Sequence, residues 1–448
     1  MAQRTQRLLE AARKPVPEGT FAVGAGLIVS GLTAYGFQIL SFRALPKTDY
    51  TALNGLWVFV FVLAPGFFLP LEQEVSRALS HRRARGEGGG PVVRRAAAAG
   101  FALTVALALL SVLASVATPI TDRIFHGRDV LVPCLVIALF TFYFQLLSRG
   151  TLSGNGRFGG YGKILAFEGI LRLLPCAALA LAGVDQPLWY GLCLAVPPLP
   201  GTLLALRGEH GLLAPGPPAP WAELSTNIGY LLFGSLFAQV LSYAPFLGVQ
   251  ILATGHHERK VAANFIVGLF LARIPILLFQ AVQAALLPKL AGLAGAGRHA
   301  DFREGLRKLV TVVVAISAIG VLAGGTLGPP VGEILFGEKF NLGHIDLALL
   351  AAGSGLFILA LTLAQALIAL MGHARALMAW LVGIVAFVAV TAVAGDDLFL
   401  RVEIGSIAGA AASTIAMGWF LLQRMRAGVP DESLDHFVEQ IEHEPLEI

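Results

Sequence analysis

The chain has 448 residues, of which 56% are hydrophobic and only 13% charged, and its mean hydropathy is +0.74. A soluble chain of this length would form about three domains of ~150 residues, but this composition contradicts that organisation. Twelve apolar runs of roughly 20 residues, the length that crosses a ~30 Å hydrocarbon core, predict a membrane protein and leave no room for a large soluble domain.

The twelve runs are best explained as transmembrane helices. A strand of a transmembrane barrel is about 10 residues long with alternating polarity, whereas residues 101–117 are apolar on every side. The first run is too long for the apolar core of a signal peptide and lacks a cleavage site, so we expect it to remain as a helix. In chain order the predicted helices cover residues 20–42, 52–71, 96–118, 130–148, 164–183, 187–206, 226–253, 261–288, 309–328, 346–371, 376–394 and 402–422.

The basic residues predict the orientation of these helices. With the N-terminus in the cytosol, 22 of the 32 Lys and Arg residues lie on the cytosolic side and eight on the other, as the positive-inside rule requires. We therefore expect both termini in the cytosol. The net charge of +4 does not indicate nucleic-acid binding, because it is dispersed among short loops beside apolar helices.

Four matches in sequence order indicate an internal duplication. Residues 37–42 (FQILSF) match residues 238–243 (AQVLSY), which aligns Gln38 with Gln239 and Ser41 with Ser242. Six helices per copy mean that both copies enter the membrane in the same direction and form parallel halves. The other matches join residues 69–71 to 287–289, 119–127 to 329–337, and 156–157 to 372–373.

The predicted fold is therefore an all-α polytopic membrane protein with two six-helix bundles. Two such halves enclose a cleft that opens to either side in turn, which is the arrangement for alternating access. From residue 427 the tail carries seven acids and no Lys or Arg, and it is either a short amphipathic helix or a solvated segment. The expected parts are a cytosolic N-terminal segment (1–19), an N-terminal bundle (20–206), a cytosolic linker (207–225), a C-terminal bundle (226–423) and an acidic cytosolic tail (424–448).

Several short motifs resemble the multidrug/oligosaccharidyl-lipid/polysaccharide (MOP) exporter superfamily: residues 70–77 (PLEQEVSR), 286–292 (LLPKLAG) with Phe302 and Leu306, and 334–340 (ILFGEKF). Over residues 20–423 the chain is most similar to the Wzx-type polysaccharide flippases. The resemblance implies a V-shaped pair of bundles in the bacterial inner (plasma) membrane. Such a flippase moves a polyprenyl-diphosphate-linked oligosaccharide to the outer leaflet for cell-surface polysaccharide biosynthesis. Its implied partners are that lipid-linked saccharide, membrane lipids and other polysaccharide-assembly membrane proteins.

The alternative is an ion-coupled drug or small-metabolite exporter of the same superfamily. Such exporters commonly carry an acid in the first or seventh helix, but residues 20–42 and 226–253 contain no Asp or Glu. A drug exporter needs a deep carboxylate for cations, and the sequence offers Glu168, with Arg172 beside it. A membrane-embedded glycosyltransferase is disfavoured, because the longest outer segment, near residues 329–345, is short.

Arg273 is the first candidate for contact with the substrate. It lies twelve residues into the predicted eighth helix, about 18 Å along the axis and close to the bilayer midplane. A charge in lipid costs at least ~2.5 kcal/mol, so an intramembrane arginine lines a substrate pathway by default. The alternative is a structural arginine bound to backbone carbonyls. Lipid-diphosphate flippases have a cationic lining at an equivalent helix, which the resemblance adds in support.

Other polar residues of the predicted spans have two possible roles each. Arg172 and Glu168 share a helix face and form either a self-neutralising pair or a site in which Arg172 binds a diphosphate and Glu168 is its competing counter-ion. The neutral groups on the first and seventh helices either bind sugar hydroxyls or hold helices together. They are Tyr35, Gln38, Ser41, Asn227, Ser235, Gln239 and Ser242.

The sequence contains no nucleotide-binding GxxxxGK[ST] motif and no nucleophile-elbow motif. We therefore expect neither enzymatic activity nor a cofactor. The run His256-His257-Glu258 lacks the further ligands of a closed zinc site, so no metal site is expected. Transport energy must come from an ion gradient, the membrane potential or the substrate concentration.

Overall fold

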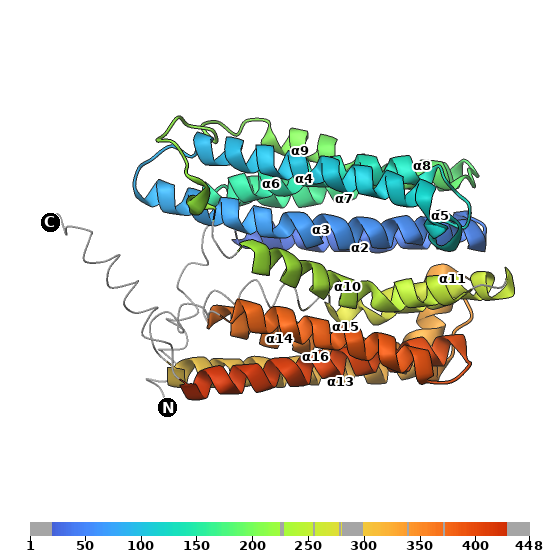
Figure 1. Ribbon diagram of the computed structural model, residues 1–448. Coiled ribbons are helices and arrows are strands. Elements are labelled where there is room, and N and C mark those ends of the chain that lie inside the picture. The colour runs from blue at the N-terminus through green and yellow to red at the C-terminus, as the bar shows by residue number, and fades with distance from the viewer. Residues whose placement is uncertain are drawn as a thin grey trace, which may run out of the picture. The chain divides into compact units, whose positions relative to one another are not determined.

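The computed structural model describes residues 20–224, 228–253, 256–276, 279, 299–337, 340–370 and 372–427, and within them the regular structure is helical without strands. Eleven helices in these ranges are long and apolar enough to cross a membrane, so the chain is a multi-pass membrane protein. Figure 1 labels most of them. The helices are α2 (Thr20–Ala44), α3 (Lys47–Ala84), α4 (Gly90–Ala117), α5 (Ile120–Ile124), α6 (Leu131–Gly154), α7 (Phe158–Leu181), α8 (Pro187–Ala195), α9 (Pro198–Leu206), α10 (Ile228–Leu252), α11 (His256–Ala272), α13 (His299–Phe336), α14 (His344–Ala369), α15 (His373–Val393) and α16 (Leu398–Ala427).

Within the described residues each predicted span lies in helix, and several helices run further than the apolar residues that predicted them. α3 and α13 have 38 residues each, about 57 Å of helix, so they extend well beyond a ~30 Å hydrocarbon core. Hydropathy marks only the part inside the membrane. The predicted sixth span is divided into α8 and α9 at Pro197. The predicted eighth span is a shorter apolar helix, Val261–Ile276, within the described residues, and most of residues 277–298 lie outside them.

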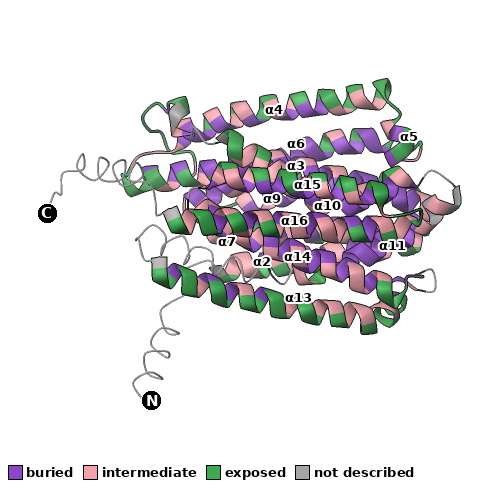
Figure 2. Cartoon of the chain, turned by 60° about the horizontal axis from the view of Figure 1, so that its bottom comes forward, coloured by how far each residue is buried: buried purple, intermediate pink, exposed green. Residues whose placement is uncertain are grey.

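The first compact unit runs to Leu232 and takes in residues 254–263. In its interior α3 packs against α6, α2 pairs with α7, and α4 lies on the outside of α6. Every residue of α3 from Tyr50 to Val58 is buried. In contrast, α4 has exposed apolar side chains along its length (Figure 2). The central helix is enclosed by protein, and the outer helix presents a side suited to lipid.

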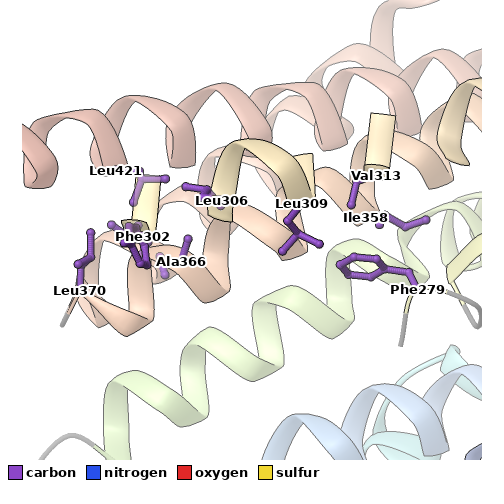
Figure 3. Close-up of a cluster of buried hydrophobic side chains, with 11 residues drawn as sticks. Phe279, Phe302, Leu306, Leu309, Val313, Ile358, Ala366, Leu370 and Leu421 are labelled. Atoms are coloured by element: carbon purple, nitrogen blue, oxygen red, sulfur yellow. The ribbon is translucent and has the colours of Figure 1, made fainter. Parts of the chain in front are cut away.

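The second compact unit contains Phe233–Ala253 and the residues from Asn264 onward. Its central helix α14 packs against α13 and α16, and α15 packs on α16. A buried apolar cluster joins the ends of these helices through Phe302, Leu370 and Leu421 (Figure 3). The pairing of α13 with α14 corresponds to that of α4 with α6, and α15 with α16 corresponds to α7 with α9. These matching pairs support the two-repeat plan expected from the duplicated motifs.

Small residues allow α2 and α7 to touch along their backbones. A Cβ added to Gly26 would collide with the carbonyl oxygen of Gly162, and one added to Gly162 would collide with that of Ala22. Both contacts would be closer than the 3.0 Å that real Cβ atoms respect. Since the colliding atoms belong to the backbone, the two helices themselves would have to separate.

We expect Gly162→Ala to destabilise the first unit by about 1–3 kcal/mol, the usual cost of overpacking an interior. The thermal unfolding midpoint of the purified protein in detergent measures this effect. Gly159→Ala, on the same helix, is the matched control, because a Cβ added at Gly159 meets nothing within 4 Å. Equal midpoints for the two variants would contradict the backbone contact.

Residues 214–224, called the strap below, are fastened to the turn between α3 and α4. Arg82 is 4% exposed and donates through Nη2 to the Glu223 carboxylate at 2.7 Å. The amide of Gly90 donates to the carbonyl of Ala214 at 2.9 Å. The hydrogen bonds from Arg82 hold the pKa of the Glu223 carboxyl below its ordinary value. Arg82 also donates to the carbonyl oxygens of Gly88, Pro217 and Pro218.

We expect Glu223→Gln to lower the thermal midpoint at neutral pH, because Arg82 then loses its buried counter-ion. A carboxyl with a lowered folded-state pKa stabilises fully above its unfolded value, about 4.3, and loses that contribution as the pH falls through the folded value. The difference in midpoint between wild type and Glu223→Gln should therefore be constant from pH 8 to about 5 and shrink below that. A difference that grows on acidification would be inconsistent with this pair.

Candidate functional site

A cavity in the second unit lies between α10, α14, α16 and the end of α11. Its volume is about 20 Å³, which is room for about one water molecule. Its wall is mainly apolar, with one charged group, Arg273, and three serine hydroxyls, from Ser242, Ser354 and Ser406. The remaining lining residues are Leu241, Pro245, Phe246, Leu269, Ile276, Leu350, Gly353, Phe357 and Ala410.

Arg273 stands where the α11 helix breaks. α11 ends at Ala272, Arg273 is in a turn, and helical residues resume at Ile274. Pro275 accounts for this break, because proline has no N–H to donate to the carbonyl of Leu271, four residues earlier, and its ring clashes with that carbonyl. Interrupted membrane helices free backbone groups for binding, which is why they recur at transport sites.

The Arg273 guanidinium is oriented by residues of α10. It donates to the hydroxyl of Ser242 and, through Nη1, to the carbonyl of the same residue at 3.3 Å. Its central carbon lies 4.5 Å from the ring centroid of Tyr243 and 5.4 Å from that of Phe246. The side chain is partly exposed at the cavity wall. A planar cation packed against two aromatic rings keeps its remaining N–H groups available for an anion.

Glu403 of α16 is a buried acid that our sequence reasoning missed. It is 0% exposed, and neither carboxylate oxygen has a hydrogen-bond partner in the described part of the chain. Ser406 and Ala410, which line the cavity, follow on the same helix face. One turn before it, Phe399 stacks on Phe265 of α11 with centroids 4.7 Å apart. Glu403 is thus enclosed about one helical turn beyond the cavity lining.

A signal for Glu403 was present in the sequence. It is the second residue of the predicted span 402–422 and the only acid in that run. A position so close to the end of an apolar run suggests solvation at the membrane surface. In the structure α16 begins four residues earlier, at Leu398, and α14 and α11 cover this turn. Tertiary packing, rather than position along the helix, places the carboxyl in the interior.

Glu168 and Arg172 form a closed pair inside the first unit. Arg172 is 1% exposed, and its Nη1 donates to Glu168 Oε1 at 2.7 Å. Its Nη2 donates to the carbonyl of Ser30 at 3.3 Å, and its guanidinium carbon lies 5.7 Å from the ring centroid of Trp57. The hydroxyl of Ser30 lies 3.5 Å from the other Glu168 oxygen. This geometry favours the self-neutralising alternative, because each charge is already met by protein.

The other expected site residues differ in their surroundings. Gln38 is 1% exposed and accepts a hydrogen bond from the Tyr50 hydroxyl at 3.0 Å. Ser41 contacts the thiol of Cys176, with Oγ and Sγ 3.8 Å apart. Tyr35 and Gln239 are partly exposed, on α2 and α10. The structure thus brings Ser242 and Arg273 together, whereas Gln38 and Ser41 pack within the first unit.

A second buried charge network lies in the first unit, between α3, α6 and α7. Arg149 lies 3.2 Å from the carboxylate of Glu72, and the Tyr161 hydroxyl donates to the same oxygen at 2.9 Å. Glu72 is 6% exposed, although its place at the end of an apolar run suggested a solvated acid. Within the described residues no group of three His, Cys, Asp or Glu side chains is arranged to hold a metal ion.

Sequence comparison finds relatives that match most of this chain. No protein-family profile matches the sequence. A Mycobacterium tuberculosis protein is 27% identical over 391 residues, covering 83% of this chain and 84% of the relative, and a Mycobacterium bovis protein is 24% identical over 378 residues, covering 79% and 81%. Both relatives are described as uncharacterised.

Solved structures identify the fold. A Vibrio cholerae MATE transporter matches with a TM-score of 0.67 at 13% identity, covering 92% of this chain and 97% of its own. An inward-facing multidrug resistance MATE transporter of the MOP superfamily matches at 0.71 and 14%, covering 89% and 95%. The chain has the MATE fold. This helical fold is built from two repeats, and an outward-facing MATE transporter also matches, at 0.67 and 16%, covering 91% and 95%.

The buried pair of Glu168 and Arg172 predicts that removing one charge destabilises the protein more than removing both. Arg172→Gln should destabilise the protein by about 3–5 kcal/mol, because it leaves the Glu168 charge buried without its partner. The double variant Glu168→Gln with Arg172→Gln should recover most of that loss, since no charge remains. Thermal midpoints of the three purified proteins test this, and a single variant as stable as wild type would rule out the closed pair.

Proposed function

We propose that this chain is a membrane transporter working by alternating access, and that it exports a drug or small metabolite in exchange for an ion. The MATE fold supports this proposal, since the matching solved structures include multidrug resistance transporters. The predominance of basic residues in one set of loops supports a cytosolic position for both termini, and the bacterial inner membrane is part of this proposal.

The observation that carries the proposal is the buried Glu403 carboxyl beside the cavity. A carboxylate without a partner costs several kcal/mol in an interior that excludes water. Either a proton or a small cation offsets that cost when it binds. Ion-coupled export needs a group whose occupancy changes in this way close to the solute site, and Glu403 meets that requirement. It also supplies the deep carboxylate that a drug exporter requires.

Glu403→Gln should abolish ion-driven export while leaving the fold intact, because the amide is isosteric but neutral, so it cannot exchange a proton and binds a cation far more weakly. In proteoliposomes with an imposed pH or sodium gradient, we expect gradient-driven ethidium transport to fall at least tenfold. Passive exchange of ethidium at equilibrium should persist. Glu304→Gln, at an exposed acid paired with Lys308, is the control. Gradient-driven transport at the wild-type rate in Glu403→Gln would end the ion-coupled proposal.

The second candidate is the flipping of a polyprenyl-diphosphate-linked oligosaccharide. Arg273 favours it, because a guanidinium at a cavity wall suits a diphosphate better than a cationic drug. The neutral hydroxyls of Ser354 and Ser406 suit sugar hydroxyl groups. The lack of an acid in α2 and in α10 also fits this candidate better than a cation exporter.

The two candidates separate in one pair of assays. If the chain is a flippase, Arg273→Ala should block the appearance of a fluorescent polyprenyl-diphosphate saccharide in the outer leaflet and leave ethidium export unchanged. If the chain is a drug exporter, Glu403→Gln should stop ethidium export and wild type should not flip the saccharide. Flipping by wild type and Arg273→Ala at the same rate would exclude the role of Arg273 in the flippase candidate.

A further inference from the structure

The exposed apolar face of α4 ends in an arginine. Exposed residues recur along this helix at 94, 98, 101, 109, 113 and 116, a spacing that keeps them on one face. Phe101 is 54% exposed, Leu113 64% and Val116 82%. Arg94 is exposed two turns before Phe101 on the same face. An apolar stripe with a basic end matches the two parts of a phospholipid: the stripe faces the acyl chains, and the basic end lies at the level of the headgroup.

The depth of Arg94 and Arg95 in the membrane follows from the length of the apolar run that comes after them on α4. The run from Ala96 to Ala117 contains no charged residue. Its 22 residues span about 33 Å, which fills a hydrocarbon core of ~30 Å. α4 begins at Gly90, so Arg94 and Arg95 lie directly outside that core, at the level of lipid headgroups. The loops at this end are the basic ones, which corresponds to the inner leaflet in the orientation proposed above.

The strap places an aromatic side chain beside these arginines. Trp221 is 61% exposed, and the Arg95 guanidinium carbon lies 4.9 Å from the centroid of its ring. Tryptophan is enriched at this depth in membranes, because its ring suits the interface between headgroups and hydrocarbon. The hydrogen bonds of Arg82 fix the strap to the turn between α3 and α4, which holds Trp221 beside Arg95. This pair of side chains is called the corner below.

The nearby acids do not neutralise this corner. Glu223 binds Arg82, and Glu74 binds Arg77 with oxygen and nitrogen 2.9 Å apart. Arg94 has no acidic partner in the described part of the chain. Positive charge therefore remains at the headgroup end of the α4 face.

We propose that the α4 face binds one anionic phospholipid of the surrounding membrane. Arg94 and Arg95 hydrogen-bond the phosphate, for which guanidinium geometry is well suited. Trp221 packs beside the headgroup, and an acyl chain lies along the stripe that includes Phe101 and Leu113. The site uses residues of the first unit alone, so it stands whether or not the transport function proposed above is correct.

Competition between two lipids tests this proposal. The full-length protein is placed in micelles with equal amounts of phosphatidylglycerol and phosphatidylcholine, and native mass spectrometry counts the lipids that remain bound. We expect the first bound lipid to be phosphatidylglycerol by about fivefold or more, the preference that one basic residue near a membrane surface supplies. The double variant Arg94→Gln with Arg95→Gln should bind both lipids equally.

Two controls keep the result interpretable. Arg307→Gln removes an exposed arginine at the corresponding end of α13 and should leave the fivefold preference unchanged. Inorganic phosphate at about 10 mM, well below the ~0.15 M physiological ionic strength, should not displace the lipid. Displacement by phosphate would show a simple anion site and overturn the lipid assignment. Equal binding of the two lipids by wild type, or a preference that survives the double substitution, would also overturn it.

Discussion

The structure depends on one constraint, which is that a polar group inside the membrane must find its partner within the protein. Lipid offers no hydrogen bonds, so each unmet group costs several kcal/mol. The first unit pairs its buried charges: Arg172 binds Glu168 and Arg149 binds Glu72, and the Tyr50 hydroxyl binds Gln38. Single polar atoms of Gln38, Glu72, Arg149 and Arg172 still have no hydrogen-bond partner among the described residues. Within the described residues of the second unit, Glu403 is a carboxyl that does not meet the constraint.

The two units therefore differ in how their buried polar groups are paired, although they share the same arrangement of helices. The aligned serines illustrate it, because Ser41 contacts the Cys176 thiol whereas Ser242 orients the Arg273 guanidinium. Duplication supplied the same residue at the same place in both copies, and the neighbouring helix decided its use. In the second unit, a helix broken at Pro275 and a buried acid on α16 lie beside a cavity that Arg273 lines, and the Glu403 carboxylate has no hydrogen-bond partner among the described residues.

Packing between helices is secured by small residues and by the strap. Gly26 and Gly162 allow α2 and α7 to meet along their backbones, which gives the dispersion contacts that replace hydrophobic driving force in lipid. Outside the hydrocarbon, where water competes, Arg82 fastens the strap with a charged pair and several carbonyl contacts. The same hydrogen bonds of Arg82 hold Trp221 beside Arg95. The strap is thus part of the lipid site that we propose on α4.

Within the described residues, the sequence alone determined the helical class and the span positions, because hydropathy over 20 residues reports directly on crossing a hydrocarbon core. The matching motifs indicated the two-repeat plan. The sequence also singled out Arg273 and the Glu168–Arg172 pair, since a charge within an apolar run is rare. Only tertiary structure decided which of these charges are closed off and which line a cavity, and that Glu403 is buried at all. Burial depends on which neighbouring helices cover a turn, and a linear pattern carries no information about those neighbours.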